Sequence, residues 1–273
     1  MRSQKTTNGS KVKSICAVCA FLWLSGLAFA QDSRNLTPVQ LKIEQQQQRL
    51  SSSDVEERRD AVMRLGAMRR AAASRAALPA LQDAAAIVRA TAAKSILSLG
   101  NEESARYLLP LLNDKDEFVR RETAYALGHT HSRSATAALS DALLNDKEDG
   151  VQGAAAVALG QIADEAAVIA LVGTLAPELS GPAKKKQKQE VNPFVLRAAA
   201  AALGQIKSRA GTAALVSALN NEKLSSDVRR EAARSLGLIG DPAAAPALRA
   251  ASTAADPFLA EIAHQALKKL ARG

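Results

Sequence analysis

The sequence predicts an all-α solenoid, a right-handed superhelix of stacked two-helix repeats. An alanine-rich amphipathic run that closes with Leu-Gly or its equivalent recurs along the chain. It ends at Gly66, Leu97, Gly128, Gly160, Gly204, Gly237 and Lys268, which are 31, 31, 32, 44, 33 and 31 residues apart. Hydrophobic residues make up 47% of the chain but aromatic residues only 3%, a composition that suits closely packed helices. A helix pair with one apolar face per helix cannot bury that face alone, so each pair is expected to stack on the next.

The first helix of each repeat has sequence signals at both ends. A short polar side chain is predicted to cap its N-terminus, at Asp116, Asn192, Asp227 and Asp256. Proline follows directly in two repeats, as Pro193 and Pro257, where its missing N–H costs nothing. The glycine of the repeat is predicted to end the helix, because the residue past the last turn often needs a positive φ. At Leu97 the glycine is absent, and the helix is expected to continue to Gly100.

The second helix of each repeat carries leucines three and four positions apart, such as Leu139 with Leu143, which gives it one apolar face. Thr37 and Pro38 predict a capping helix in the segment 31–51. The repeats are then expected to fill 52–273 as about six helix pairs and a terminal helix. The 44-residue interval contains an insertion at 177–192 with helix breakers at both ends, which predicts an exposed basic loop.

Residues 1–30 have the organisation of a secretion signal peptide. Four basic residues and no acid precede the apolar run ICAVCAFLWLSGL, and Ala28-Phe29-Ala30 has the small-x-small pattern of a cleavage site. The apolar run is short for the roughly 20 residues of a membrane-spanning helix, which favours cleavage after Ala30 over an uncleaved anchor. We therefore expect an exported protein, periplasmic or extracellular, with no stable membrane insertion after cleavage.

Removal of this signal changes the charge and the chemistry of the chain. Lys plus Arg falls from 36 to 32 because four basic residues leave, all 27 acids stay, and the net charge falls from +9 to +5. Cys16 and Cys19, the only cysteines, and Trp23, the only tryptophan, leave with the signal. The expected mature chain contains no thiol, which excludes disulfides, cysteine–metal sites and a cysteine nucleophile.

Two stretches carry a family resemblance, FVRRETAYALGHT and DVRREAARSLGLIGDPAAAPAL. Val119-Arg120 and Val228-Arg229, the Ala-Ala-x-x-Leu-Gly stretch and the following Ala-x-Pro-Ala-Leu resemble the HEAT-repeat family, in the short bacterial type also called PBS-lyase HEAT-like repeats. The resemblance covers about residues 52 to 271. It implies the α-solenoid fold and says almost nothing about function.

Some proteins with similar repeats are enzymes, but the sequence argues against an enzyme here. Deoxyhypusine hydroxylases, which the chain resembles in its repeats, bind two irons through His-Glu pairs, whereas His129, His131 and His264 are followed by Thr, Ser and Gln. The bilin lyases of this repeat type act on cytoplasmic proteins, which conflicts with export. We expect no catalytic residue and no cofactor. A bilin-lyase-like or hydroxylase-like enzyme, or an enzyme accessory, is the alternative.

Metal ions and nucleic acids are the other ligand classes to consider. His129 and His131 have the spacing of a metal chelate, but they lie in a predicted turn, where histidine is commonly solvated, and no third ligand is evident. Phe118, Phe194 and Phe258 recur at the starts of first helices, which indicates packing residues rather than platforms for base stacking. With a mature charge of only +5, we expect neither a metal site nor a nucleic-acid partner.

Acidic residues gather where the first helices begin. Asp114, Asp116 and Glu117 are expected to cap the helix and to pair with Arg120 and Arg121 of the same repeat. This interpretation is favoured over paired catalytic carboxylates.

The predicted function is that of an exported, non-catalytic scaffold that binds a protein or peptide partner on the concave face of the solenoid. Second helices are expected to line that face. Their positions outside the leucine stripe, together with nearby helix starts, are the candidate binding residues: Arg75, Arg106, Arg133, Asp141, Arg209 and Ser217. The alternative is a solvated surface, because exposed charges usually contribute little energy. In the inserted loop, Lys184, Lys185, Lys186 and Lys188 are predicted to form an auxiliary electrostatic contact or a solvated linker.

Overall fold

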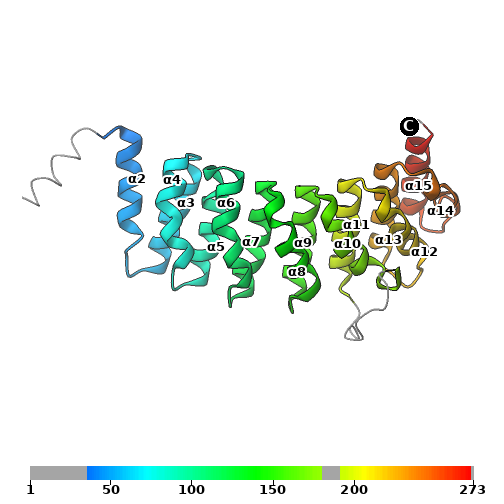
Figure 1. The fold of residues 1–273 in the computed structure, drawn as a ribbon, viewed down its shortest axis with the longest axis horizontal. Helices are drawn as coiled ribbons and strands as arrows, with labels where there is room; N and C mark the ends of the chain where they lie inside the picture. Colours follow the sequence, from blue (N-terminus) through cyan, green and yellow to red (C-terminus); the bar gives the residue numbers. More distant parts are fainter. Residues whose placement is uncertain (1–35, 180–190, 272–273) are drawn as a thin grey trace, which may run out of the picture.

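The structure is a computed structural model that describes residues 36–179 and 191–271. These residues form helices that follow one another in a single curved stack, and none of them belongs to a strand (Figure 1). The all-α solenoid predicted from the sequence is therefore confirmed.

After α2 (Pro38–Arg49), the helices alternate between two layers. The odd-numbered layer consists of α3 (Val55–Ala67), α5 (Ala86–Ser95), α7 (Glu117–Thr130), α9 (Asp149–Ile162), α11 (Pro193–Ile206), α13 (Ser226–Ile239) and α15 (Pro257–Leu270). The even-numbered layer consists of α4 (Ala71–Ala77), α6 (Asn101–Leu108), α8 (Thr136–Asn145), α10 (Val168–Leu175), α12 (Thr212–Asn220) and α14 (Ala245–Ala251). Short 3-10 turns extend or precede the even-numbered helices: η2 (Leu78–Gln82), η4 (Leu109–Asn113), η5 (Arg133–Ala135), η6 (Glu165–Ala167), η7 (Pro177–Leu179), η8 (Arg209–Gly211) and η9 (Pro242–Ala244).

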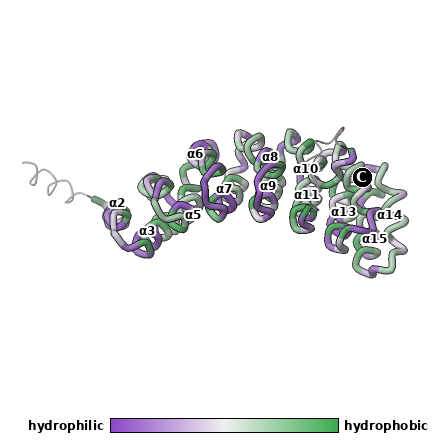
Figure 2. Tube along the Cα trace, turned by 90° about the horizontal axis from the view of Figure 1, so that it is seen from below, coloured by the Kyte–Doolittle hydropathy of each residue, from purple (hydrophilic) through white to green (hydrophobic). Residues whose placement is uncertain are grey.

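The two layers differ in how closely their helices pack. Each odd-numbered helix contacts the next odd-numbered helix extensively, whereas neighbouring even-numbered helices touch one another far less. In a curved stack, the layer with the closer helices lies on the inner side. Figure 2 shows this arrangement, because α3, α7, α11 and α15 follow the inner side of the arc while α6, α8 and α10 follow its outer side. The prediction that second helices line the concave face is therefore wrong.

Three of the four predicted N-caps are confirmed. The side chains of Asp116, Asn192 and Asp256 each accept a hydrogen bond from the backbone N–H two residues further on, at 2.9 to 3.0 Å. Helix α13 begins two residues earlier than predicted, at Ser226 with Ser225 as its N-cap, so Asp227 lies in its first turn instead of capping it.

The repeated glycine has a different role from the predicted one. All five of these glycines lie inside their helices, and a left-handed residue comes three positions after each of them: Arg69, His131, Ala163, Lys207 and Gly240. A Cβ at Gly160 would lie 2.9 Å from the Cα of Ala202 on α11, a separation that real Cβ atoms essentially never show. The equivalent distance from Gly128 to the Cα of Ala158 is 2.8 Å. The glycines therefore allow successive odd-numbered helices to approach within backbone contact.

Helix α5 is the exception to this pattern. Leu97 stands where the other helices carry glycine, and α5 ends before it, at Ser95, followed by the 3-10 turn η3 (Leu97–Leu99) and by Gly100 at φ 101°. The predicted continuation of the helix to Gly100 is therefore wrong. Because the equivalent glycines pack against the backbone of the next helix, a helical leucine would collide with α7, and the chain leaves the helix at this point.

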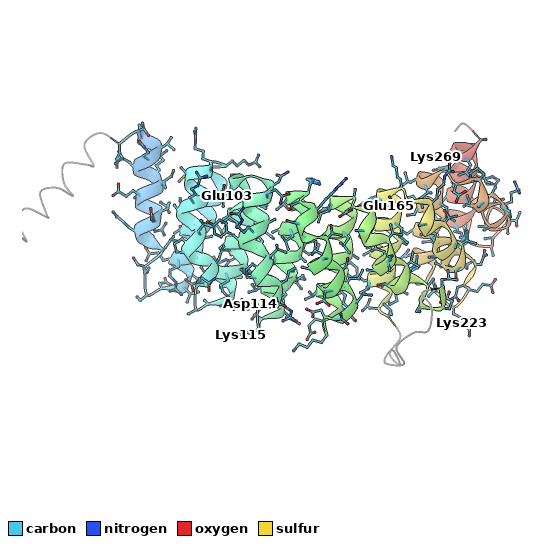
Figure 3. The ribbon with its side chains drawn as sticks, viewed as in Figure 1. Glu103, Asp114, Lys115, Glu165, Lys223 and Lys269 are labelled. Atoms are coloured by element: carbon cyan, nitrogen blue, oxygen red, sulfur yellow. The ribbon has the colours of Figure 1, made fainter. Side chains whose placement is uncertain are left out.

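A ladder of arginine–aspartate pairs joins the lower ends of the odd-numbered helices, where Figure 3 labels Asp114. Arg89 donates from Nε and Nη2 to the two carboxylate oxygens of Asp114, at 2.7 and 2.8 Å. Similar two-bond pairs are Arg58 with Asp83, Arg120 with Asp146 and Arg230 with Asp256. Each pair links one repeat to the next, so the predicted pairing of Asp114 with Arg120 of its own repeat is wrong.

The ladder lowers the pKa of its aspartates. Hydrogen bonds from Arg58 hold the pKa of Asp83 below its ordinary value, against the opposing effect of burial. For Asp114, burial is the largest single influence and acts to raise the pKa, but hydrogen bonds from Arg89 and from the Asp116 N–H, together with nearby positive charge, leave it lowered. These carboxylates are therefore bound in their charged form.

The close glycine contact predicts that Gly→Ala, which usually stabilises a helix, lowers the stability of this protein. In a helix interior, Gly→Ala normally stabilises by up to about 1 kcal/mol. Gly160→Ala should instead destabilise by about 1–3 kcal/mol, because the new methyl group forces α9 and α11 apart. Gly150→Ala in the same helix is the control, since its Cβ would meet only the side chain of Arg121, with Cδ at 3.6 Å and Nη1 at 3.9 Å, and it should be neutral or stabilising. Urea midpoints measure both; a stabilising Gly160→Ala would contradict the close contact.

The ladder predicts a loss of stability in acid. Folded-state pKa values below the unfolded value of about 4 mean that the stabilisation is complete above that pH and is lost as the pH falls through the lower folded values. At pH 7, Arg89→Met should cost about 1–3 kcal/mol, because it leaves the Asp114 carboxylate without its partner. Arg64→Met, which removes an exposed pair within α3, should cost far less. Urea midpoints from pH 7 to pH 3 test this, and equal costs for the two variants would contradict it.

Candidate functional site

The candidate residues from the sequence do not come together in one site. They lie on the even-numbered helices or in the turns that enter them: Arg75 (α4), Arg106 (α6), Arg133 (η5), Asp141 (α8), Arg209 (η8) and Ser217 (α12). Some already have partners in the chain, since Arg75 Nη2 lies 3.4 Å from Glu103 and Ser217 donates to Glu178 at 2.7 Å. No observation tests whether these residues bind a partner. They lie on the outer layer, so the predicted concave position that was the reason for choosing them is wrong.

The basic loop is only partly within the structure. Its described flanks are η7 and Val191, which precedes the N-cap of α11. Lys184, Lys185, Lys186 and Lys188 lie outside the described residues, so the contact predicted for them stays untested.

Arginines recur at one position of the inner, odd-numbered helices. When the repeats are aligned by their glycines, four arginines fall at equivalent positions on α3, α7, α11 and α13: Arg59, Arg121, Arg197 and Arg230. Arg197 is exposed and forms no ion pair with any described residue. Arg230 is held by Asp256 and Asp227, which raise its pKa. The inner face therefore presents a row of guanidinium groups, some of which form ion pairs within the chain and some of which do not. We call this set the arginine row.

Phe118 and Phe194 lie one helical turn before Arg121 and Arg197, and Phe258 holds the equivalent position on α15. The guanidinium of Arg121 lies 5.1 Å from the ring centre of Phe118, and that of Arg230 lies 5.1 Å from the ring centre of Phe258 on the next helix. Phe194 contacts Gly153 of the preceding helix so closely that a Cβ at that position would overlap its ring. These rings therefore pack against their neighbours only in part, because 39% of Phe194 and 68% of Phe258 are exposed.

The inner face is hollowed over α5. A groove of about 390 Å³ lies above this helix, where Ala90 and Thr91 leave space between taller neighbours. Its walls are Arg59 and Met63 of α3 and Phe118 and Glu122 of α7. Small side chains on one helix and large ones on its two neighbours thus produce the hollow, which we call the α5 groove.

The histidines have structural or solvated positions. His131 ends α7 in the left-handed conformation, at φ 50°, and its Nδ1 donates to the carbonyl of Gln161 at 2.8 Å. His129 and His264 are exposed. Within the described ranges, no three His, Cys, Asp or Glu side chains gather in a way that suits a metal ion.

The sequence matches a family model along most of its length. The model for HEAT repeats matches residues 43–128, 106–179 and 187–268. The chain belongs to the HEAT-repeat family. No match was found among curated proteins.

Solved structures from different organisms are similar to this chain. Escherichia coli YibA has a TM-score of 0.58 at 22% identity, over 86% of this chain and 82% of that one. The complex of CpcE and CpcF of phycocyanin lyase from Nostoc has a TM-score of 0.48 at 26% identity, over 87% and 92%. Human deoxyhypusine hydroxylase has a TM-score of 0.44 at 21% identity, over 85% of each chain. The likeness to YibA shows the fold alone, and the other two scores are lower.

The length and polarity of the described helices show whether any of them could span a membrane. Among residues 36–179 and 191–271, every helix is too short or too polar to cross a bilayer.

The arginine row and the α5 groove were missed at the sequence level, although the row was visible there. Aligning first helices by their glycines places Arg59, Arg121, Arg197 and Arg230 in one column without any structure. The column was overlooked because the second helices were expected to form the concave face. The groove has no such signal, since it depends on side-chain heights on three separate helices.

Proposed function

We propose that the protein is an exported, non-catalytic scaffold that holds a protein or peptide partner on the inner face of its odd-numbered helices. The observation that carries this proposal is the row of arginines beside partly exposed phenylalanines on that face. Arginine and aromatic side chains are enriched in the buried centres of protein interfaces and contribute much of their binding energy. A curved stack also offers an extended surface to a partner, which suits binding better than enclosing a small substrate.

Export is supported by the order of features in residues 1–30. The basic start, the apolar run and Ala28-Phe29-Ala30 match a cleavable signal, and cleavage would leave a mature chain that starts at Gln31. A net charge of +5 on that chain, with no tryptophan, favours a protein partner over a nucleic acid. The lysines of the inserted loop are proposed as an auxiliary contact, because ~1 kcal/mol each on an anionic surface is too weak to bind alone.

Intact mass tests the export proposal. In a bacterial host, the protein should be recovered from the periplasm or medium with a mass that lacks residues 1–30. Ala28→Arg with Ala30→Arg should block cleavage, because the peptidase accepts only small side chains at these positions. A full-length mass from the cytoplasm for the unaltered chain would contradict the proposal.

Site-specific crosslinking tests the binding face. A photo-reactive amino acid placed on the inner helices, at Tyr125, Arg197 or Arg234, should crosslink a partner in cells that make the protein natively. The matched outer positions are Arg106 on α6, Asp141 on α8 and Ile169 on α10, which should not crosslink the same partner. Mass spectrometry of the products identifies the partner, and crosslinks confined to the outer positions would contradict the inner-face assignment.

A further inference from the structure

The α5 groove combines an apolar floor and walls with charged groups at its rim. Met63, Ile87 and Phe118 supply the large apolar side chains, and Met63 is 52% exposed. The volume of about 390 Å³ is enough for a few side chains and too small for a folded domain. A groove of this kind accommodates a short segment of a partner chain.

Arg59 at the rim has an unused hydrogen-bonding edge. In the four ladder pairs, an arginine donates from Nε and Nη2 to both oxygens of one carboxylate. Arg59 instead donates only from Nη1, to Glu56 at 3.2 Å, and its Nε is buried without a partner among the described residues. In Arg59 the Nε of the edge that binds a carboxylate elsewhere in this chain is therefore without an acceptor, and a buried donor without an acceptor is unfavourable. Because this Nε is buried, the side chain has to turn before a carboxylate from outside the chain can reach it.

The other charges around the groove leave no acid of the chain to fill this edge. Glu122, the acid that lines the groove, contacts Lys94 and lies 3.7 Å from Arg121. Asp60, the next residue of α3, is held by Arg49 and Arg64. Lys94 and Glu122 thus offset each other in the groove lining, and Arg59 has only its exposed contact with Glu56. The charge of the groove is complementary to an anionic group from outside.

We propose that the α5 groove binds an extended segment of a protein partner in which an aspartate or glutamate adjoins an aliphatic residue. The Arg59 side chain turns toward the groove and pairs through Nε and Nη2 with the partner's side-chain carboxylate, and the partner's aliphatic side chain enters the groove between Met63, Ile87 and Phe118. A charged two-bond pair supplies orientation, and the buried apolar side chain supplies affinity. This inference rests on the proposed function and names the chemistry that the inner face selects.

A displayed library of random heptapeptides, selected on the purified chain, provides the probe. Selected sequences should contain Asp or Glu next to Leu, Ile, Val or Phe. The strongest peptide is then labelled with fluorescein and titrated by anisotropy, with Asp→Asn, Leu→Ser and C-terminally amidated versions. The first two changes should each weaken binding by about tenfold or more, while amidation should have no effect.

Variants of the chain locate the binding site. Arg59→Gln removes the charged edge, and Thr91→Leu fills the groove from its floor with a residue that favours helix. Each should weaken binding by about tenfold or more, and Arg59→Lys should fall between wild type and Arg59→Gln because it keeps the charge without the two-bond geometry. Arg249→Gln is the control, since Arg249 is exposed on the outer helix α14, and it should change binding by less than about twofold. Arg197→Gln, at the helix position of Arg59 but outside the groove, should weaken binding less than Arg59→Gln does. Far-UV circular dichroism and thermal midpoints confirm that each variant is folded.

Several results would overturn the assignment. Selection of sequences without an acid beside an aliphatic residue, wild-type binding by both groove variants, or dependence on a free C-terminus would each do so. An Arg197→Gln effect equal to that of Arg59→Gln would mean that binding is spread along the inner face. In these cases inner-face crosslinking would still support the scaffold proposal, whereas loss of those crosslinks would remove the scaffold proposal itself.

Discussion

Close approach between successive odd-numbered helices is the constraint on which the rest of the structure depends. Glycine on one helix faces alanine or serine on the next, as Gly160 faces Ala202 and Gly204 faces Ser235, so that backbones meet without intervening side chains. The even-numbered helices touch each other far less. One layer is therefore held tighter than the other, and the stack curves toward it (Figure 2).

The curvature decides which side chains a partner meets. Residues that point away from the core on the odd-numbered helices fall on the inner side of the arc, while those on the even-numbered helices fall on the outer side. The arginine ladder fixes the lower ends of the inner helices from one repeat to the next, through pairs such as Arg89 with Asp114. Rows of equivalent residues, including the arginine row, thus keep a regular position along the inner face.

The inner face separates structural from available arginines. Arg58, Arg89 and Arg120 donate from Nε and Nη2 to aspartates of the following repeat. One position further along the helix, Arg59 has the same donors without an acceptor among the described residues, beside an apolar groove. Successive positions on a helix point in directions about 100° apart, so neighbouring arginines meet different partners. Position alone does not decide the role, because Arg230, at the helix position of Arg59, pairs with Asp256.

The sequence by itself determined the all-α solenoid, the repeat spacing and most helix starts, because these depend on local patterns such as the caps at Asp116 and Asp256. It did not determine the partner of Asp114, which lies 25 residues away at Arg89, or the reason for Gly160, which is a contact with another helix. The direction of curvature was likewise decided by the relative spacing of two layers. The α5 groove arises only when Arg59, Thr91 and Phe118 from three helices come side by side. Helix starts and repeat spacing depend on residues that are close in the sequence, so the sequence alone predicts them. Surfaces are made by residues from different helices, and their shape depends on how closely those helices pack.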